Sequence, residues 1–541
     1  MRNTLRDKAP AAKEAHASTS TGTYVLRSKE DHGPISSYDS NHELSTPIRS
    51  EVSSDTSLFQ KIHIAVSIVL LFLNYFTAQY DKFILSYFQT AFSQSLSLSA
   101  PEYGVLSGYA TGIVYALLAL PIAYLADYLP SARVWTLTIA SLWWSLCVIL
   151  QSLCHNFWQV FLARIGMGIG QSAVEALSIS LISDMIEWRN VFLGSSAFYV
   201  GVYIGEAVSG HIAVAFPDNP DGWRIALRAI GIVGLVLAVL VRLVIRDSKR
   251  QESIVRTARK FELGAAPANQ PNKAAAAKSE LRDTVSYVLR MRSFWLLVLS
   301  AGFRQLAGNV FGYYMPSYLA NTYPNHPELL SRYGIIVGVV GSVTVLAGGA
   351  ITSVLWHKTK LTPLYMTGIG GMISSLFVLL MLFSRDIANG NQDRGISILY
   401  GMMSVAYLTA ESWLGALFGL IALLLPPAYK TFGLAIWGAL QVLIYSSGPQ
   451  IIGLALRNTD PGSATYTKDT QVALAVIIPV GYWLAGVGFL FAVPLLKRDL
   501  VEDIASHQIG RSRKMGVLIF GAVLGSLVVA LFVASIYYSA V

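Results

Sequence analysis

Thirteen long apolar segments constrain this chain more than any other feature of its sequence. A helix that crosses the hydrocarbon core of a bilayer needs about 20 mostly apolar residues, and its backbone polar groups must find hydrogen-bond partners within the protein. We therefore predict thirteen membrane-spanning helices and an all-α fold. The predicted spans are residues 62–92, 101–125, 133–153, 156–184, 190–213, 222–245, 293–319, 330–355, 361–384, 395–425, 430–456, 470–496 and 515–539.

The composition supports a membrane protein. Hydrophobic residues make up 54% of the chain and charged residues only 13%, whereas soluble domains carry about 25% charged residues. The two cysteines, Cys147 and Cys154, lie in one predicted span, so they cannot form the disulfide framework of a small secreted domain. The fourth and tenth segments are longer than a span requires, and we expect each to include an amphipathic end.

The loops between the spans carry basic residues very unequally. If the N-terminal tail is cytoplasmic, 29 of the 40 Lys and Arg residues fall in cytoplasmic segments, 6 fall in the opposite loops and 5 lie within spans. Cytoplasmic loops are the ones that membrane proteins enrich in Lys and Arg. We therefore predict a cytoplasmic tail and a C-terminus on the opposite side. The net charge of +9 follows from these loops and does not indicate nucleic-acid binding.

A polar linker divides the predicted spans into two sets of six. Six spans on each side of a cytoplasmic loop is the plan of two-half transporters, which hold substrate near the middle of the membrane between the halves. The thirteenth segment lies outside this symmetry. The expected domains are a disordered cytoplasmic tail at 1–60, a six-helix bundle at 61–245, a cytoplasmic loop at 246–292, a second six-helix bundle at 293–496, and a basic linker with the extra helix at 497–541.

The loop after the second predicted span reads Ala123-Tyr-Leu-Ala-Asp127-Tyr-Leu-Pro-Ser-Ala-Arg133. It resembles the cytoplasmic loop Gly-x-x-x-Asp-Arg-x-x-Arg of the major facilitator superfamily, with Ala123 in place of the glycine and Tyr128 in place of the first arginine. The resemblance implies a fold of two six-helix bundles and a gating role for Asp127 and Arg133.

A second resemblance, over about residues 65–250, is to the Spinster-like transporters of that superfamily. It rests on Asn74-Tyr75, on Asp81-Lys82-Phe83, on the run from Ala163 to Ala173, and on Leu181-Ile-Ser-Asp184. The resemblance implies movement of lysophospholipids or phosphorylated sphingoid lipids, either coupled to protons or facilitated.

Two positions depart from the Spinster-like pattern. Gln171 replaces the buried glutamate of that family and cannot take up a proton. Lys82 replaces an arginine, so it lacks the two-pronged hydrogen bonding of a guanidinium. The neighbouring Asp81 matches the acid of the family.

Charged residues within a span usually face a cavity or one another. In the fourth predicted span, Arg164, Gln171 and Glu175 are spaced i, i+7 and i+11, which places the other two within about 20° of Arg164 on a helix. We expect this stripe to line the cavity, with Glu175 as a candidate for the missing carboxylate. The alternative is a structural role in bonding neighbouring helices.

The fifth and seventh predicted spans add further polar side chains. Tyr199, Tyr203 and Glu206 share one helical face, either to line the cavity, with Glu206 paired to an intramembrane cation, or simply to pack. Arg304 is the expected anion contact of the second half, and its structural alternative is a salt bridge to Glu411.

These considerations give two predicted groups of site residues and a gating loop. The substrate-binding residues are Lys82, Arg164, Gln171, Tyr199, Tyr203, Arg304, Asn309 and Tyr313. The proton-coupling carboxylates are Asp81, Glu175 and Glu206. The gating residues are Asp127 and Arg133.

The sequence thus predicts a secondary transporter that moves an amphipathic organic anion or a lysolipid-like substrate by alternating access. A small organic-anion or sugar symporter is the alternative within this class, and a receptor or scaffold that keeps the bundle is the alternative outside it. We find no His-Glu-x-x-His, P-loop or Gly-x-Ser-x-Gly motif, so we expect no enzyme, metal or cofactor. The expected partners are a small-molecule or lipid substrate, membrane lipids and, in the coupled case, protons. We expect a monomer in the plasma membrane or an endolysosomal membrane.

Overall fold

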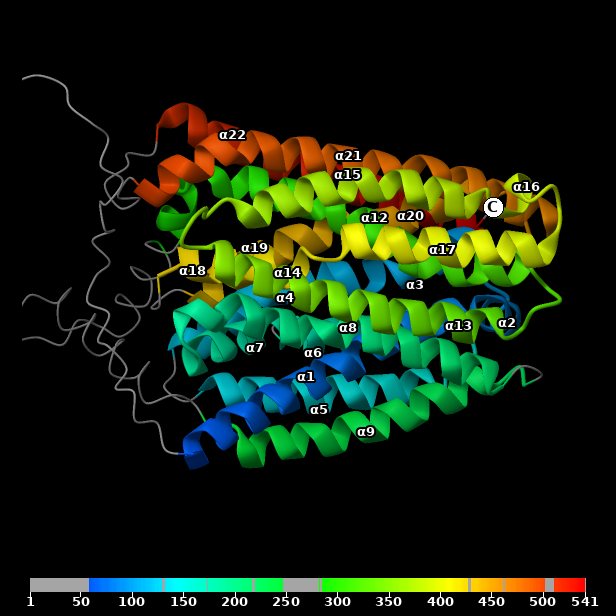
Figure 1. The fold of residues 1–541 in the computed structure, drawn as a ribbon. Helices are drawn as coiled ribbons and strands as arrows, with labels where there is room; N and C mark the ends of the chain where they lie inside the picture. The colour runs from blue at the N-terminus through cyan, green and yellow to red at the C-terminus, as the bar shows by residue number, and fades with distance from the viewer. Residues whose placement is uncertain are drawn as a thin grey trace, which may run out of the picture. The chain divides into compact units, whose positions relative to one another are not determined.

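The computed structural model describes residues 58–128, 132–172, 174–216, 219–246, 282, 285–426, 430–460, 463–501 and 510–540. The regular structure in these ranges is helical, and the long helices run side by side along one common direction (Figure 1). Thirteen of them, taken with their direct continuations, are long and apolar enough to cross a membrane. This confirms the all-α membrane fold. The predicted tail up to residue 57 and most of the linker at 246–292 lie outside the described residues.

The first six spans end within a few residues of the predicted boundaries. The first predicted span ran to residue 92 because its helix, α1 (Leu58–Tyr87), is separated from the short α2 (Gln89–Ser95) only at Phe88. Hydropathy does not reveal this break. The helices are α1 (Leu58–Tyr87), α2 (Gln89–Ser95), α3 (Ala100–Ser107), α4 (Tyr109–Tyr128), α5 (Ala132–Gln151), α6 (Phe157–Gln171), α7 (Val174–Met185), η1 (Trp188–Asn190), α8 (Val191–Val214) and α9 (Gly222–Val244).

The second six spans and the thirteenth follow the same pattern. The element η2 is a π-helical stretch within the eighth span. The helices are α12 (Arg292–Thr322), α13 (Leu329–Ile336), η2 (Val337–Gly341), α14 (Ser342–Leu355), α15 (Thr362–Leu382), α16 (Ser384–Ile387), α17 (Gln392–Ala410), α18 (Leu414–Leu424), α19 (Lys430–Tyr445), α20 (Ser447–Ala455), α21 (Ala464–Val501) and α22 (Arg511–Ala540).

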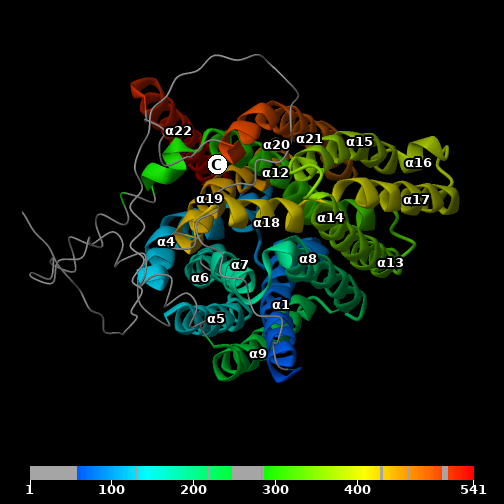
Figure 2. The same cartoon turned by 60° about the vertical axis from the view of Figure 1, so that its left-hand side comes forward.

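The helices pack as two groups that meet along a central seam. In the first group α1 packs on α8 and α9, and α5 packs on α6 and α9; in the second, α21 packs on α12 and α15. Across the seam, α4 lies against α19, and α8 lies against α13, α14 and α18 (Figure 2). The short α3 packs against α20. This arrangement is the two-half plan around a central site that the sequence predicted.

The tenth span differs from the expectation of an amphipathic end. Its first helix, α17, ends at Ala410, and α18 begins at Leu414 after a break at residues 411–413. The second helix is apolar throughout, and its residues Leu414–Ala422 are buried. The extra length of this segment therefore comes from a mid-membrane interruption, which apolar residue counts cannot detect. The fourth span consists of α6 and α7, with residue 173 outside the described part.

The second and eleventh spans are in close contact where both are interrupted. Gly108 separates α3 from α4, and Ser446 separates α19 from α20. A Cβ atom built on Gly108 would collide with the Ser446 backbone carbonyl. Glycine is therefore required at position 108 for the two halves to meet at this depth.

The lipid-facing surface is apolar, as an integral membrane protein requires. On α9, for example, the side chains of Ile225, Ile232, Val236 and Leu243 are exposed. The thirteenth helix, α22, is the most exposed candidate span. It packs against α3 of the first half and α20 of the second, so it lies over the seam, outside the two-half symmetry.

Candidate functional site

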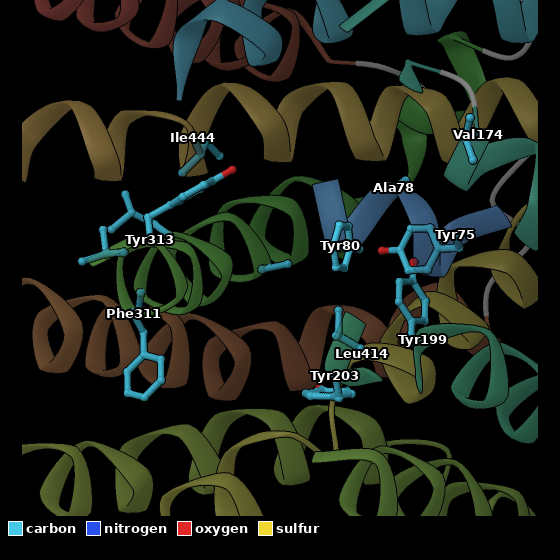
Figure 3. Close-up of a cluster of buried hydrophobic side chains, with 14 of the residues drawn as sticks. Tyr75, Ala78, Tyr80, Val174, Tyr199, Tyr203, Phe311, Tyr313, Leu414 and Ile444 are labelled. Atoms are coloured by element: carbon cyan, nitrogen blue, oxygen red, sulfur yellow. The ribbon is translucent and has the colours of Figure 1, made fainter. Parts of the chain in front are cut away.

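A cavity of about 170 Å³ lies between the two halves. Both halves build its wall, and aromatic side chains of α1, α8 and α12 cluster around it (Figure 3). Every predicted substrate-binding residue except Tyr199 borders this cavity, as do all three predicted proton-coupling carboxylates.

Lys82, on α1, meets the second half directly. Its Nζ donates a 2.8 Å hydrogen bond to Oδ1 of Asn309 on α12. The same Nζ lies 5.3 Å from the ring centre of Phe83, 5.2 Å from that of Tyr445 and 6.0 Å from that of Tyr313. Cations at this distance are attracted to aromatic faces. We call these three rings and Asn309 the lysine cage.

Arg304 forms the salt bridge that the sequence offered as its structural alternative. Its Nη2 lies 3.1 Å from Oε1 of Glu411 and donates a 2.9 Å hydrogen bond to the carbonyl of Ala410. The guanidinium carbon lies 4.3 Å from the Tyr482 ring centre and 5.2 Å from that of Trp413. Arg304 is only 1% exposed, yet it borders the cavity. The second-half cation is therefore already charge-compensated.

Glu411 also accepts a hydrogen bond from the opposite half. The Tyr203 hydroxyl, on α8, donates to Oε2 of Glu411 at 2.7 Å. Because Glu411 follows the last residue of α17, the break in the tenth span places this carboxylate at the seam. Sequence reasoning named Glu411 only as a structural partner. Its position as an acid inside an apolar segment is the signal that could have identified it.

Glu175 is held by tyrosine hydroxyls of the first half. Tyr199 donates to its Oε1 at 2.7 Å, and Tyr75 donates to the same oxygen at 3.4 Å. Figure 3 shows Tyr75 and Tyr199 side by side, with ring centres 5.6 Å apart. Tyr199 therefore binds a carboxylate that borders the cavity but does not border the cavity itself.

Glu206 also bonds to tyrosine and not to a cation. The Tyr333 hydroxyl, from α13 in the second half, donates to its Oε1 at 3.2 Å. The expected pairing with an intramembrane cation is not the contact that the structure gives this residue. Glu206 is 4% exposed and borders the cavity.

Arg164, Gln171 and Glu175 all reach the cavity, as a single stripe requires. Arg164 donates a 2.9 Å hydrogen bond from Nη1 to the carbonyl of Leu106. Close to it, the buried carboxylate of Asp81 has the Trp144 indole N–H as a neighbour, but neither group makes a hydrogen bond of standard geometry among the described residues. Buried polar atoms normally have a partner, so Asp81 keeps capacity for water, a proton or a ligand.

The two halves are tied together at the predicted cytoplasmic end. Arg133, at the start of α5, forms a 2.8 Å ion pair with Asp184 at the end of α7. Lys430, at the start of α19, reaches the same carboxylate at 3.2 Å. The side chain of the other predicted gating residue, Asp127, lies outside the described part. Sequence reasoning did not identify Asp184 and Lys430 as partners of this end.

Hydrogen bonds also join the halves at the opposite end. Gln89 donates to the Tyr466 hydroxyl at 2.7 Å. The Tyr103 hydroxyl donates to the Tyr313 carbonyl at 3.3 Å. The cavity therefore lies between two sets of contacts that must break in turn for a solute to enter from one side and leave on the other.

Two six-span halves around a charged central cavity, with ties at both ends, define an integral membrane transporter. The family model described as Major Facilitator Superfamily matches residues 71–449. The chain belongs to this superfamily, and it is a transporter of the major facilitator type.

Three comparisons place the chain among its relatives. An MFS-type efflux pump of Mycolicibacterium smegmatis is 24% identical over 435 residues, covering 78% of this chain and 91% of that protein. A sphingosine-1-phosphate transporter of Danio rerio is 23% identical over 252 residues, or 44% of this chain and about half (47%) of that relative. The crystal structure of a bacterial homologue of the human lysosomal transporter Spinster aligns with a TM-score of 0.57 at 17% identity, covering 81% of this chain and 97% of that one. The predicted Spinster-like resemblance is confirmed.

Proposed function

We propose that this chain carries an amphipathic organic anion through the membrane by alternating access, with Lys82 as the main contact of the anionic group. The transporter class follows from the family. The substrate class is supported by one observation above all, which is the environment of Lys82.

Lys82 is a cavity cation that makes no salt bridge within the described part of the chain, and the carboxylates of Glu175 and Glu206 act on it only from a longer distance. An ammonium group has three N–H donors, and the structure accounts for one of them, at the neutral amide oxygen of Asn309. Arg304 and Lys430, by contrast, are paired with carboxylates. An incoming carboxylate or phosphate can therefore bind Lys82 without first displacing a charged side chain of the protein.

The lysine cage indicates that the substrate has an apolar part next to its anionic group. The rings of Phe83, Tyr313 and Tyr445 surround Nζ at 5.2–6.0 Å, so a solute bound to Lys82 meets aromatic surface immediately. Binding sites commonly combine such apolar walls with a few polar groups that fix orientation. An amphipathic anion satisfies both components.

The charge balance of the cavity supports proton coupling. Three cations border it, namely Lys82, Arg164 and Arg304, together with the four carboxylates of Asp81, Glu175, Glu206 and Glu411. If all seven are ionised the cavity carries a net charge of −1, and a bound monovalent anion makes it −2. Uncompensated charge in a low-dielectric site is costly. A proton that enters with the anion offsets this cost, and the predicted carriers are Asp81, Glu175 and Glu206.

The size of the cavity favours a small organic anion as a second candidate substrate. About 170 Å³ suits a small organic anion more readily than a long-chain lipid, whereas the sphingosine-1-phosphate relative favours a lipid phosphate. Both candidates present an anionic group to Lys82. We further propose that the transporting unit is a monomer, because one chain builds the whole cavity wall.

The test is uptake by proteoliposomes that contain the purified full-length chain. The panel comprises sphingosine 1-phosphate and D-glucuronate as anions, D-xylose as a neutral solute and tetraphenylphosphonium as a lipophilic cation. Each is measured with and without an inward proton gradient. The proposal predicts saturable uptake of at least one anion, stimulated by the gradient, and no saturable uptake of D-xylose or the cation. Uptake of the cation alone would contradict it, and the two anions distinguish the lipid from the small solute.

A further inference from the structure

Glu411 differs from the other carboxylates of the cavity in its partners. Glu175 and Glu206 accept hydrogen bonds from tyrosines. Glu411 combines an ion pair to Arg304 with a hydrogen bond from Tyr203 of the opposite half. Within the described part of the chain, it is the one cavity carboxylate that holds both a cation and a tie across the seam.

The Arg304 guanidinium keeps donor capacity beyond Glu411. Its Nε is buried and has no hydrogen-bond partner among the described residues. The side chain packs between aromatic rings and beside Gly371, where a Cβ atom would come within 3.5 Å of Nε. A guanidinium offers five N–H donors in a fixed planar arrangement, so Arg304 can accept an incoming anion in competition with Glu411.

Arg304 and the proposed anion contact border the same cavity. Asn309, which binds Lys82, is five residues further along α12, or about 7.5 Å along the helix axis. A solute whose anionic group enters the lysine cage therefore brings negative charge into the cavity that the Arg304–Glu411 pair also lines. Two anions then compete for one guanidinium, and a proton on Glu411 removes the competition.

We propose that Glu411 is the carboxylate that the substrate anion displaces from Arg304, and that Glu411 takes up the co-transported proton when this ion pair opens. The inference rests on the proposed function and deepens it, because it assigns the coupling step to a residue outside the predicted proton-coupling set. No covalent bond changes other than the transfer of a proton from water to a Glu411 oxygen.

Because groups from both halves face Glu411, its protonation affects the contact between the halves. They are Arg304 on α12, Tyr203 and Glu206 on α8, Tyr407 on α17 and Tyr482 on α21. When Glu411 is protonated and released from Arg304, the Tyr203 hydroxyl loses a charged acceptor. Hydrogen bonds to charged groups are about twice as strong as neutral ones, so the tie between α8 and the second half weakens as the proton enters.

The first experiment compares wild type with Glu411→Gln, which mimics the protonated carboxyl. In proteoliposomes, uptake of D-glucuronate and sphingosine 1-phosphate is measured with a proton gradient, and counterflow is measured without one, between pH 5.5 and pH 8. We expect Glu411→Gln to lose gradient-driven accumulation while keeping counterflow that no longer depends on pH. The control is Glu328→Gln, the same chemical change in a loop outside the cavity, which should match wild type.

Three further variants keep this test decisive. If Glu411→Gln fails to fold because it leaves Arg304 uncompensated, Arg304→Gln/Glu411→Gln removes both charges and should also lose pH dependence. Glu175→Gln and Glu206→Gln are measured in parallel. The proposal is overturned if either of these loses gradient-driven accumulation while Glu411→Gln retains it.

The second experiment needs no solute and therefore separates this inference from the proposed substrate class. Spin labels replace the exposed His211 on α8 and Arg332 on α13, two helices that pack across the seam, and their separation is measured at pH 8 and pH 5.5. Acidification should lengthen it in wild type but not in Glu411→Gln, which should resemble the acid state at both pH values. An equal response in the two proteins overturns the inference. Absence of uptake for every anion would instead refute the proposed function.

Discussion

Asp184 and Lys430 lie in opposite halves of the transporter, and Lys430 Nζ reaches the Asp184 carboxylate at 3.2 Å. The same carboxylate pairs with Arg133 at 2.8 Å, so one acid connects α5, α7 and α19 at the predicted cytoplasmic end. Ser180 and Thr431 form a further hydrogen bond of 2.8 Å across this seam. Opening of the cavity towards the cytoplasm requires these contacts to break.

Asp184→Asn should favour the state that is open at this end. The variant leaves two cations facing a neutral amide, and loss of hydrogen bonds to a charged group costs on the order of 1–3 kcal/mol. We expect a lower thermal midpoint and a larger separation between spin labels at the exposed Leu193 on α8 and Val354 on α14. A wild-type separation in Asp184→Asn would show that this carboxylate does not hold the end closed.

Gly334→Ala should block closure at the opposite end of the seam. Gly334, on α13, faces α8, and an added Cβ would lie 2.8 Å from the backbone carbonyl oxygen of Ala207. Because backbone cannot give way as a flexible side chain can, α13 and α8 must separate. We expect loss of transport with the protein still folded and inserted. Gly401→Ala, where nothing lies within 4 Å of the new Cβ, is the matched control, and equal loss in both would refute the steric argument.

Removal of residues 511–541 should reduce stability more than activity. The helix α22 contributes a buried hydrogen bond between Gln450 and Ser535 and ring contacts of Phe532 with Phe161 and of Phe520 with Trp295. Among the described side chains of α22, none borders the cavity. We expect the truncated chain to transport with a lower thermal midpoint, and Ser535→Ala to show a smaller decrease. Complete loss of transport from a folded truncated protein would assign α22 a direct role.

The two ends of α22 should lie on opposite sides of the membrane. Single cysteines introduced at Lys514 and Tyr538, both exposed, can be labelled in intact cells with an impermeant maleimide, since the native cysteines are buried. The charge distribution predicts labelling at position 538 and protection at position 514 until the cells are permeabilised. Labelling at both positions before permeabilisation would show that α22 does not span.

The positions of the spans could be predicted from the sequence because lipid imposes a strict length and polarity on each helix. Interruptions could not be predicted in the same way. Residues 411–413 break the tenth span inside an apolar segment, and this break is what presents Glu411 to Arg304 and Tyr203. Hydropathy records composition and contains no information about a local change in backbone direction.

The sequence indicated which side chains reach the cavity, but not how they pair. A charge within a span is a strong signal, and Lys82, Arg164 and Arg304 do border the cavity; their roles in binding stay a prediction. Which cation is compensated depends on partners far apart in sequence, such as Glu411 for Arg304, 107 residues away. Tyr199 shares a helical face with Tyr203, yet its hydroxyl binds Glu175 and its side chain does not border the cavity.

Replacement of Lys82 tests the central claim most directly. The measurement is the concentration dependence of anion counterflow in proteoliposomes with wild type, Lys82→Arg and Lys82→Met, using whichever panel anion wild type transports. If Lys82 contacts the anionic group, Lys82→Met should weaken the apparent affinity by about tenfold or more, equivalent to about 1.4 kcal/mol. Lys82→Arg, which keeps the charge, should lose less. Wild-type affinity in Lys82→Met, with the protein folded and inserted, would contradict the account.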